Sequence, residues 1–394
     1  MISVNEAKDI VRNNIKLLTP VTIPLQEASG YVLANHIYAS IDIPAFPQSA
    51  MDGYAFSFND FSPGQRLEIA GEVPAGINKV FNNLSGKAIR IFTGAPVPKG
   101  ADTVVMQEKV AVENTALLIL DEQLVKGSNV RPMGLEIKAG TLALPSGTFL
   151  SPAALGFLAG TGVSEVKVYP KPRITIIVTG KELQTPGKPL LPGQVYESNS
   201  VTIKAVLHQL HITDVAVVLV HDDLGILKNA LENALLTSDV VLLTGGISVG
   251  DYDFVLQATE QCGVEKLFHK IKQRPGKPLY FGKKEEKVVF GLPGNPSSVL
   301  TCFYEYVILA IEGLTGRKDI IKVKQLQLDK VFTKKTSLTH FLKGLYNGKT
   351  VSPLDAQESF RLSSFARANC LIVLEENKED FNEGDEVEVH LLPL

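Results

Sequence analysis

The sequence has few of the residues that build disulfide or zinc frameworks. Its 394 residues include three cysteines, Cys262, Cys302 and Cys370. They lie far apart and inside apolar segments, which argues against both a disulfide framework and a CxxC zinc site. We therefore expect reduced, buried thiols.

An excess of charge of either sign is also missing. Lys and Arg number 39 and Asp and Glu number 42, so the formal net charge is −3. This balance argues against DNA or an anionic membrane as a partner. The first residues lack the basic-then-apolar pattern of a leader, and no run of about 18 apolar residues is present. We expect a soluble cytoplasmic protein with no nucleic-acid or membrane partner.

A chain of this length, without repeats or low-complexity segments, should divide into several domains. Ser3 and Glu6 have the form of a capping box ahead of an amphipathic helix, and Ser151 followed by Pro152 begins a second, short helix. Between these helices, residues 31–138 show short strands separated by Pro- and Gly-rich turns. This pattern predicts a small β region.

From residue 174 onward, apolar β-branched strands alternate with helical segments. Continuous apolar strands with intervening helices predict a parallel sheet covered on both faces. A β-rich segment follows residue 317. The expected fold class is therefore multidomain α/β and β, with a central doubly wound α/β domain. The expected α/β strands are ITIIV (174–178), VAVVLV (215–220), DVVLL (239–243) and VVF (288–290).

Polar, turn-forming residues follow all four of these strands. They are TGKE at 179–182, HDD at 221–223, TGGISVGDYD at 244–253 and GLPGN at 291–295. One such loop is more simply interpreted as a turn and a helix cap. Ligands of open α/β sheets, however, bind beyond the carboxyl ends of the strands, and three of these four loops carry carboxylates. The sequence therefore predicts a binding site along this rim.

The rim combines groups that could bind anions with groups that could bind a cation. In QRPGKP, Arg274 and Lys277 suit an oxyanion, although a solvated turn is the simpler alternative. Asn295 and Pro296 begin a long helix whose free N–H groups can receive a phosphate, and Ser248 could add a hydroxyl.

Carboxylates that lie beside phosphate-binding groups repel a phosphate ligand unless a hard cation lies between the two. Mg²⁺ is the usual answer, and the candidate ligands are Glu182, Asp222 and Asp253. The alternative for these three acids is helix capping at the start of three successive helices.

Six motifs in order, SAMDGYA, TGAPVP, TGKEL, GGISVGDYD, RPGKP and GLPGNP, resemble those of the molybdopterin molybdenumtransferases, which include the E domain of gephyrin. The resemblance covers essentially the whole chain. It implies a four-domain homodimer. The expected domains are an elongated dimerisation domain (1–40 plus 137–170), an inserted β domain (41–136), an α/β molybdopterin-binding domain (171–316) and a C-terminal β-barrel-like domain (317–394).

The resemblance also implies a reaction. Family members take adenylylated molybdopterin and molybdate, use a divalent cation such as Mg²⁺, and release AMP as the metal is placed on the dithiolene. The substrate cleft of one subunit is completed by the β region of the other. The molybdopterin adenylyltransferase is a further candidate partner.

Site residues follow from matching the motifs position by position. The implied catalytic set is Asp52, Thr93, Glu182, Asp222, Asp253 and Lys277, of which Glu182, Asp222 and Asp253 would hold the metal. The implied substrate-binding set is Ser248, Arg274, Pro278, Ser298, Lys343 and Ser359. Ser359 is the best match to the serine of the family's C-terminal domain, and Ser363 and Ser364 are the alternatives for that position. Three positions depart from the family: Glu136 replaces a frequent aspartate, Lys343 a frequent arginine, and Arg274 a lysine of several relatives.

Three alternatives remain at this stage. The chain could be an adenylyltransferase or another nucleotide-cleaving relative of the same α/β fold, because fold alone does not fix chemistry. It could be a non-catalytic scaffold of the gephyrin type. A dinucleotide oxidoreductase is the weakest alternative, because GGISVG lacks the GxGxxG spacing.

Overall fold

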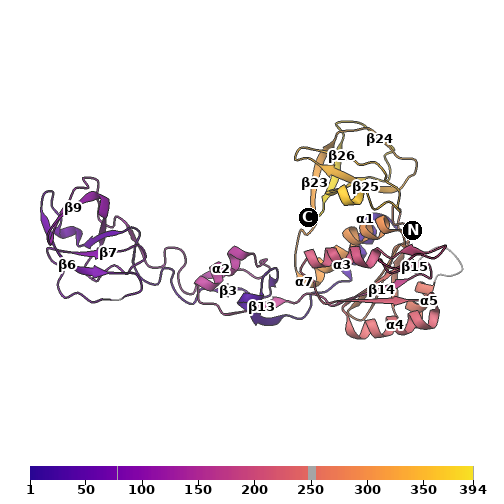
Figure 1. Cartoon of the computed structure of the whole chain (residues 1–394), viewed down its shortest axis with the longest axis horizontal. Helices are drawn as coiled ribbons and strands as arrows, with labels where there is room; N and C mark the ends of the chain where they lie inside the picture. Colours follow the sequence, from indigo (N-terminus) through magenta and orange to yellow (C-terminus); the bar gives the residue numbers. More distant parts are fainter. Residues whose placement is uncertain (78, 247–253, 394) are drawn as a thin grey trace. The chain divides into compact units, whose positions relative to one another are not determined.

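The computed structural model describes residues 1–77, 79–246 and 254–393, which fold as two compact units (Figure 1). Unit 1 comprises Met1–Thr22, Gly30–Ala34 and Lys167–Leu394, and unit 2 comprises Ile23–Ser29 and Asn35–Val166. The chain passes between the units within strands β1 (Val21–Pro24) and β13 (Glu165–Tyr169).

Unit 2 is built around a six-stranded sheet in the order β8-β5-β7-β6-β10-β9. Successive residues such as Ala55 and Phe56, or Val104 and Val105, belong to different apolar clusters, so both faces of the sheet are buried. Ser151 caps α2, as predicted, by accepting a hydrogen bond from the amide of Ala154. The elements are η1 (Leu25–Glu27), β3 (Ile37–Tyr38), β4 (Gln48–Ser49), β5 (Gly53–Phe56), η2 (Phe58–Asp60), β6 (Arg66–Val73), β7 (Lys87–Ile91), β8 (Thr103–Met106), η3 (Gln107–Lys109), β9 (Val110–Glu113), β10 (Ala116–Ile119), β11 (Val130–Arg131), β12 (Leu142–Leu144) and α2 (Pro152–Gly160).

Unit 1 begins with α1 (Val4–Asn13), where the predicted capping box is present. The amide of Glu6 donates to the Ser3 hydroxyl, and the Glu6 carboxylate accepts from the amide of Ser3. Val4, Ala7 and Val11 are buried on the inner face of this helix. Its periodic apolar residues therefore do pack into the core.

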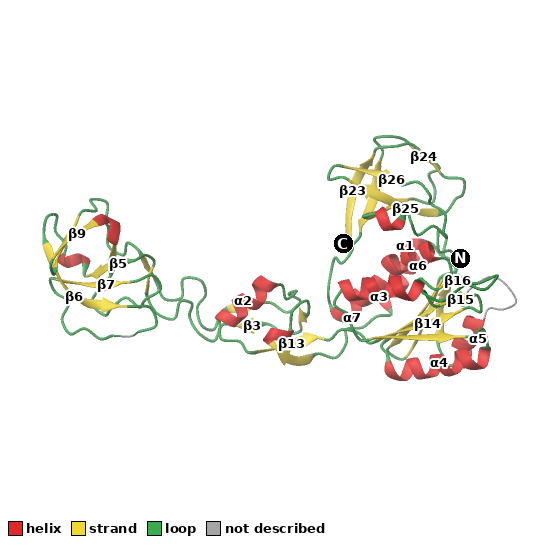
Figure 2. Ribbon diagram, in the orientation of Figure 1, coloured by secondary structure: helices red, strands yellow, loops and turns green. Residues whose placement is uncertain are grey.

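The centre of unit 1 is a six-stranded sheet in the order β17-β14-β18-β22-β21-β19 (Figure 2). Strands β17, β14, β18 and β22 run parallel, as predicted. Strand β21, which was not among the expected strands, pairs antiparallel with both β22 and β19 and so runs opposite to the other five strands of this sheet. Only Glu285 and Glu286 separate β21 from β22, and a loop that short can join only antiparallel strands. The strands are β14 (Ile174–Thr179), β17 (Val215–Val220), β18 (Val240–Thr244), β19 (Glu265–His269), β21 (Tyr280–Lys284) and β22 (Lys287–Leu292).

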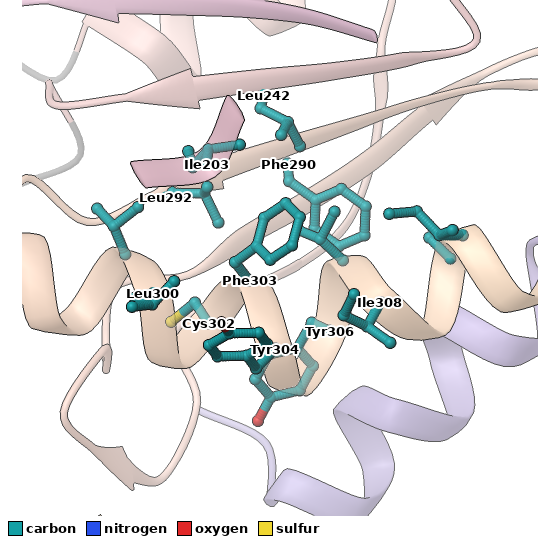
Figure 3. Packing of buried hydrophobic residues seen from close by; sticks show 14 of the residues in the cluster. Ile203, Leu242, Phe290, Leu292, Leu300, Cys302, Phe303, Tyr304, Tyr306 and Ile308 are labelled. Atoms are coloured by element: carbon teal, nitrogen blue, oxygen red, sulfur yellow. The ribbon is translucent and has the colours of Figure 1, made fainter. Parts of the chain in front are cut away.

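Helices cover both faces of this sheet, in agreement with the predicted doubly wound domain. Alternate residues of β18 divide between two apolar clusters, Leu242 in one and Val241 in the other. In Figure 1, α3 and α7 lie on one side and α4 and α5 on the other. Figure 3 shows Phe303 pointing from its helix toward Phe290 and Leu242 of the strands. The helices are α3 (Asn199–Gln209), α4 (Leu224–Thr237), α5 (Phe254–Gln261), α6 (Pro296–Cys302), the π-helix η4 (Phe303–Val307) and α7 (Ile308–Thr315).

The continuous helix Pro296–Thr315 is long and apolar enough to cross a membrane by length and composition, but 83% of its apolar window is buried inside the protein. It therefore serves as the core helix of the α/β domain. Cys302 on this helix is buried, as are Cys262 and Cys370, and all three thiols are free.

The C-terminal part of unit 1 is a closed barrel. Strands pair in the order β25-β26-β23-β29-β27, and β27 pairs back onto β25. The short strand β20 (Gln273–Arg274) of the α/β domain adds to β25. This confirms the predicted barrel-like C-terminal domain. The remaining elements are β2 (Val32–Leu33), β15 (Leu183–Gln184), β16 (Val195–Tyr196), β23 (Lys322–Leu328), β24 (Phe332–Thr333), β25 (Thr339–Tyr346), β26 (Thr350–Pro353), η5 (Phe365–Arg367), β27 (Cys370–Leu374), β28 (Asp380–Phe381) and β29 (Glu386–Leu391).

A buried charge cluster, here called the clasp, joins the barrel, α1 and the core helix. Glu305 in the π-helix accepts from Lys8 at 2.6 Å and pairs with His390 of β29 at 2.7 Å. The other ring nitrogen of His390 lies 2.9 Å from Glu388. Burial raises the pKa of Glu305, but Lys8 and His390 outweigh it and bring the pKa down to about 2. Each buried charge is therefore paired, as a low-dielectric site requires.

Candidate functional site

A cavity of about 1430 Å³ opens at the carboxyl ends of β14, β18 and β22, with one wall supplied by the barrel. This is where an open α/β sheet binds its ligands. Its lining brings together seven residues singled out from the sequence: Glu182, Asp222, Arg274, Lys277, Pro278, Ser298 and Ser359.

The glycines between the strands let these loops come close together. Gly245 has a φ of +86°, and a Cβ there would lie 2.4 Å from the carbonyl oxygen of Thr179. No other residue fits that position without moving the backbone. The loop after β18 and the loop after β14 therefore pack directly against each other at the floor of the cavity.

Helix capping does not account for Glu182 or Asp222. Strand β15, rather than a helix, follows Glu182. The cap of α4 is the neighbouring Asp223, whose Oδ1 accepts from the amide of Ile226. Asp222 instead accepts from the amide of Lys181 at 3.2 Å and lines the cavity. Both carboxylates are thus presented to the same space by the strand-end loops.

The third predicted metal ligand, Asp253, lies outside the described residues, as does Ser248. Among residues 1–77, 79–246 and 254–393 there is no cluster of three or more His, Cys, Asp or Glu side chains that could hold a metal ion. Two carboxylate-bearing residues of the cavity, Glu182 and Asp222, are therefore the part of the predicted ligand set that the structure places.

The RPGKP loop is fastened to the core helix by Gln273. The buried amide of Gln273 donates to the carbonyl of Pro275 at 3.0 Å and accepts from the hydroxyl of Tyr306. A Cβ on Gly276 would lie 2.4 Å from the sulfur of Cys302, so the loop backbone sits directly on the helix. This anchoring exposes Lys277 to the cavity. Sequence reasoning missed Gln273, although it immediately precedes the motif.

The barrel is tied to the start of the core helix through Ser359. Asn295 occupies the N-cap position, but its side-chain amide donates to the Ser359 hydroxyl at 2.9 Å instead of capping the helix. The amide of Ser297 donates to the carbonyl of Ser359 at 3.1 Å. Ser298 is buried and contributes to the cavity lining. The helix start and the barrel loop thus form one continuous wall.

Lys343, which was predicted to bind substrate, has surroundings unlike those of Lys277. It is buried in the barrel and does not belong to the cavity lining. Its ammonium donates to the backbone carbonyls of Ala356, Glu358 and Arg361 at 2.8, 3.4 and 3.1 Å. Burial lowers its pKa to about 8. The ammonium group therefore fixes the loop that carries Ser359, and its expected contact with an oxyanion stays a prediction.

In unit 2, the structure brings Asp52 and Thr93 into contact. Asp52 Oδ1 accepts from both the amide and the hydroxyl of Thr93 at 2.7 Å each. These two hydrogen bonds, first from the amide and then from the hydroxyl, lower the pKa of the partly exposed Asp52 carboxyl. Two residues 41 positions apart in the sequence therefore hold one ionised carboxylate in a fixed orientation.

Arg90 supports this pair and was not singled out from the sequence. Its guanidinium donates to the carbonyl of Gly53 at 2.9 Å and lies 5.2 and 4.8 Å from the ring centres of Tyr54 and Phe92. It lies on strand β7, three positions before the first residue of TGAPVP. Glu136, where relatives often carry aspartate, is exposed in the same unit.

Comparisons with known proteins agree along the whole chain. Family models for the MoeA N-terminal region (domain I and II), a probable molybdopterin binding domain and the MoeA C-terminal region (domain IV) match residues 2–162, 175–313 and 325–392. The molybdopterin molybdenumtransferase of Haemophilus influenzae is 34% identical over 404 residues, with 100% of both chains covered. Molybdopterin molybdenumtransferase 2 of Mycobacterium tuberculosis is 32% identical, with 99% of both covered.

Solved structures give the same result. A crystal structure of the molybdopterin biosynthesis MoeA protein from Pyrococcus horikoshii matches with a TM-score of 0.83 and 30% identity, and covers 99% of this chain and 100% of that chain. Sequence identity above 30% over full length, together with this structural match, shows that the chain belongs to the MoeA family of molybdopterin molybdenumtransferases, which are enzymes of the transferase class.

Proposed function

We propose that this protein inserts molybdate into adenylylated molybdopterin, with the help of Mg²⁺ and with release of AMP, in molybdenum cofactor biosynthesis. The observation that carries the proposal is that one cavity has in its lining both the acidic residues Glu182 and Asp222 and the basic residues Arg274 and Lys277. A phosphate-bearing substrate needs the cations, and the acids are compatible with that substrate only if a metal ion neutralises them.

The donor set fits Mg²⁺. Glu182 and Asp222 supply carboxylate oxygens, which this hard cation prefers, and it commonly uses one or two protein carboxylates together with substrate oxygens. Asp253 is the proposed third ligand. When bound, the metal would neutralise charge on the phosphate that leaves.

The remaining roles belong to the chain's own side chains. Lys277 and Arg274 would hold the tetrahedral oxyanion, because the loop that carries them is fixed by Gln273. Pro278 and Ser298 would shape the floor beneath the substrate. Catalysis would then rest on positioning and charge neutralisation, which are the main requirements for cleaving a phosphoric anhydride.

The experiment that tests this proposal measures AMP. The purified protein is incubated with adenylylated molybdopterin, molybdate and Mg²⁺, and each component is omitted in turn. We expect AMP release that requires the substrate and Mg²⁺ and is promoted by molybdate. A protein that binds the substrate but releases no AMP under any of these conditions would instead be a scaffold.

We further propose that the protein is a homodimer. The edge strand β17 leaves Val217, Val218 and Leu219 exposed, and Leu219 is 60% exposed. An exposed apolar edge strand of this kind promotes aggregation of a single chain, and a second copy of the chain could cover it. Light scattering after size-exclusion chromatography gives the mass, and a monomer would contradict the proposal.

In the proposed dimer, Asp52 and Thr93 of one copy complete the cavity of the other. Mixing two inactive variants tests this arrangement. A heterodimer of Asp52→Asn and Asp222→Asn chains has one cavity with both defects and one with neither, so about a quarter of wild-type activity should return on subunit exchange. No recovery after verified exchange would show that each copy uses its own Asp52.

Two finer features complete the proposal. The three buried free thiols fit a reducing compartment, which supports the cytoplasm as the location. The molybdopterin adenylyltransferase, which would make the substrate, is the proposed upstream partner.

A further inference from the structure

Phe360 is an aromatic side chain of the cavity lining that the proposed chemistry does not use. It lies between β26 and η5, immediately after Ser359, and its relative exposure is 63%. Exposing a phenyl ring costs free energy that a polar residue would avoid. Scattered exposed apolar residues are common, so exposure alone assigns no role to Phe360.

The backbone that carries Phe360 is held rigidly from below. The Lys343 ammonium donates to carbonyls on both sides of it, those of Glu358 and Arg361. The Ser364 hydroxyl donates to the carbonyl of Ala356 at 2.8 Å. These bonds turn the loop carbonyls into the barrel, and the carbonyl of Ser359 is bonded to the helix start. The exposure of Phe360 is therefore a property of a fixed loop.

One side of the ring also has a defined neighbour. The Arg361 guanidinium lies 5.7 Å from the ring centre, and Arg361 is itself held by Glu358 at 3.2 Å. A cation near an aromatic ring is attracted to its π system. The ring is thus oriented while most of its surface remains open to the cavity.

The surroundings indicate what could occupy that open surface. The same cavity contains Lys277, Arg274 and the start of the core helix, which suit phosphate or another oxyanion. Ligands that combine a phosphate with a flat heteroaromatic ring use both kinds of group, because such rings stack on aromatic side chains. A purine nucleotide and a phosphorylated pterin share this chemistry.

We propose that Phe360 is a stacking platform for a heteroaromatic ring of the substrate and so contributes to substrate specificity. This inference rests on the proposed function, because it assigns the ring-binding part of the same cavity. It requires that the planar π surface of residue 360, rather than apolar volume alone, sets the affinity.

The test uses three substitutions at this position in the full-length chain. Phe360→Leu keeps apolar volume and removes the π face, Phe360→Ala removes both, and Phe360→Trp enlarges the π face. Because the chain has no tryptophan, Phe360→Trp also introduces a single tryptophan at the proposed contact, and its fluorescence can be excited selectively. AMP and pterin-6-carboxylate serve as separate probes, and calorimetry measures Kd for each.

We expect Phe360→Leu and Phe360→Ala to weaken binding of one probe by about 5- to 150-fold. Phe360→Trp should retain the affinity, and that probe should quench its fluorescence. The probe that responds identifies whether the purine or the pterin stacks. Unfolding midpoints should match wild type, because the side chain is exposed.

Tyr196, a second aromatic residue of the cavity lining, provides the matched control. Its hydroxyl donates to the carbonyl of Lys188 at 2.9 Å, and Tyr196→Leu should leave both affinities near wild type. The inference is overturned if Phe360→Leu binds both probes as wild type does, or if only Tyr196→Leu weakens them. AMP release by the wild-type protein decides the proposed function separately. If the wild-type protein releases AMP but Phe360→Leu binds both probes as wild type does, the stacking inference is wrong and the proposed function stands.

Discussion

The clasp of unit 1 and the Asp52 turn of unit 2 hold a carboxylate in opposite ways. Glu305 in the clasp is buried, and its two oxygens face Lys8 and His390. Asp52 is partly exposed, and both hydrogen bonds from Thr93 go to its Oδ1. A carboxylate whose two oxygens are both paired can stabilise the fold but has no free oxygen with which to bind a ligand. A charge that is oriented and still exposed can act on one.

Two lysines of unit 1 show the same contrast. Lys343 is buried with its ammonium on three backbone carbonyls, whereas Lys277 is exposed in the cavity lining. We therefore expect substitutions of the buried, fully paired residues Glu305 and Lys343 to lower stability. Substitutions of the solvent-accessible residues Asp52 and Lys277 should lower activity.

The largest expected effect on stability is that of Glu305→Ala. It leaves Lys8 and His390 without their common partner in a buried site, which should cost about 3–5 kcal/mol of the free energy of unfolding. Urea unfolding followed by circular dichroism measures it. The control is Glu286→Ala, because the Lys16–Glu286 pair is mostly exposed and should contribute little. Equal shifts in the two variants would show that the clasp does not stabilise the fold.

The second expected effect is a pH dependence of stability set by the clasp. Burial opposes the charge on His390, but Glu305 outweighs it and raises the pKa from 6.5 to about 9. The contribution of His390 is thus complete below pH 6.5 and is lost as the pH rises through about 9. The pKa of Glu305 falls from 4.5 to about 2. The contribution of Glu305 to stability is therefore complete above pH 4.5 and is lost as the pH falls through about 2.

The clasp should therefore stabilise the protein most between pH 4.5 and 6.5. Thermal unfolding at a series of pH values measures this. In His390→Gln the decline between pH 6.5 and 9 should be shallower than in wild type, because the titrating group is gone. Parallel curves for the two proteins over that interval would contradict the assignment.

A smaller loss of stability is expected for Lys343→Met. Three loop carbonyls lose a buried donor, and unmade hydrogen bonds of this kind cost about 1–3 kcal/mol. Lys349→Met, at an exposed position of the same barrel, is the control. Because the same carbonyls orient Ser359 and Phe360, substrate affinity should also fall. Unchanged stability with reduced affinity would instead favour a direct contact between Lys343 and the substrate.

Much of the fold could be predicted because the spacing of apolar residues along the sequence indicates which segments are buried. The run ITIIV and its neighbours indicated a sheet with helices on both faces, and the capping box at Ser3 located α1. The pattern could not reveal the direction of β21, because an apolar strand reads alike in either direction. Two residues, Glu285 and Glu286, set that direction.

The site was predicted less completely, because sequence does not show where a side chain points. Two adjacent acids followed β17, and only the structure shows that Asp223 caps the helix while Asp222 faces the cavity. Lys343 lies on a strand next to a functional loop but points into the barrel. Gln273 acts through tertiary contacts, which leave no local signal.

The smallest expected effect on stability is that of Asp52→Asn. The side chain is partly exposed, and an asparagine oxygen can still accept from Thr93, so the midpoint of unfolding should change little. Activity should nevertheless fall by about 100-fold or more if this charge acts on the substrate, as removing one preorganised group from a reaction centre typically does. AMP release measures the effect, and Asp60→Asn in the same unit is the control for lost charge. A wild-type rate in Asp52→Asn would mean that the oriented carboxylate only shapes its turn, and the contrast with Glu305 would then lie in exposure alone.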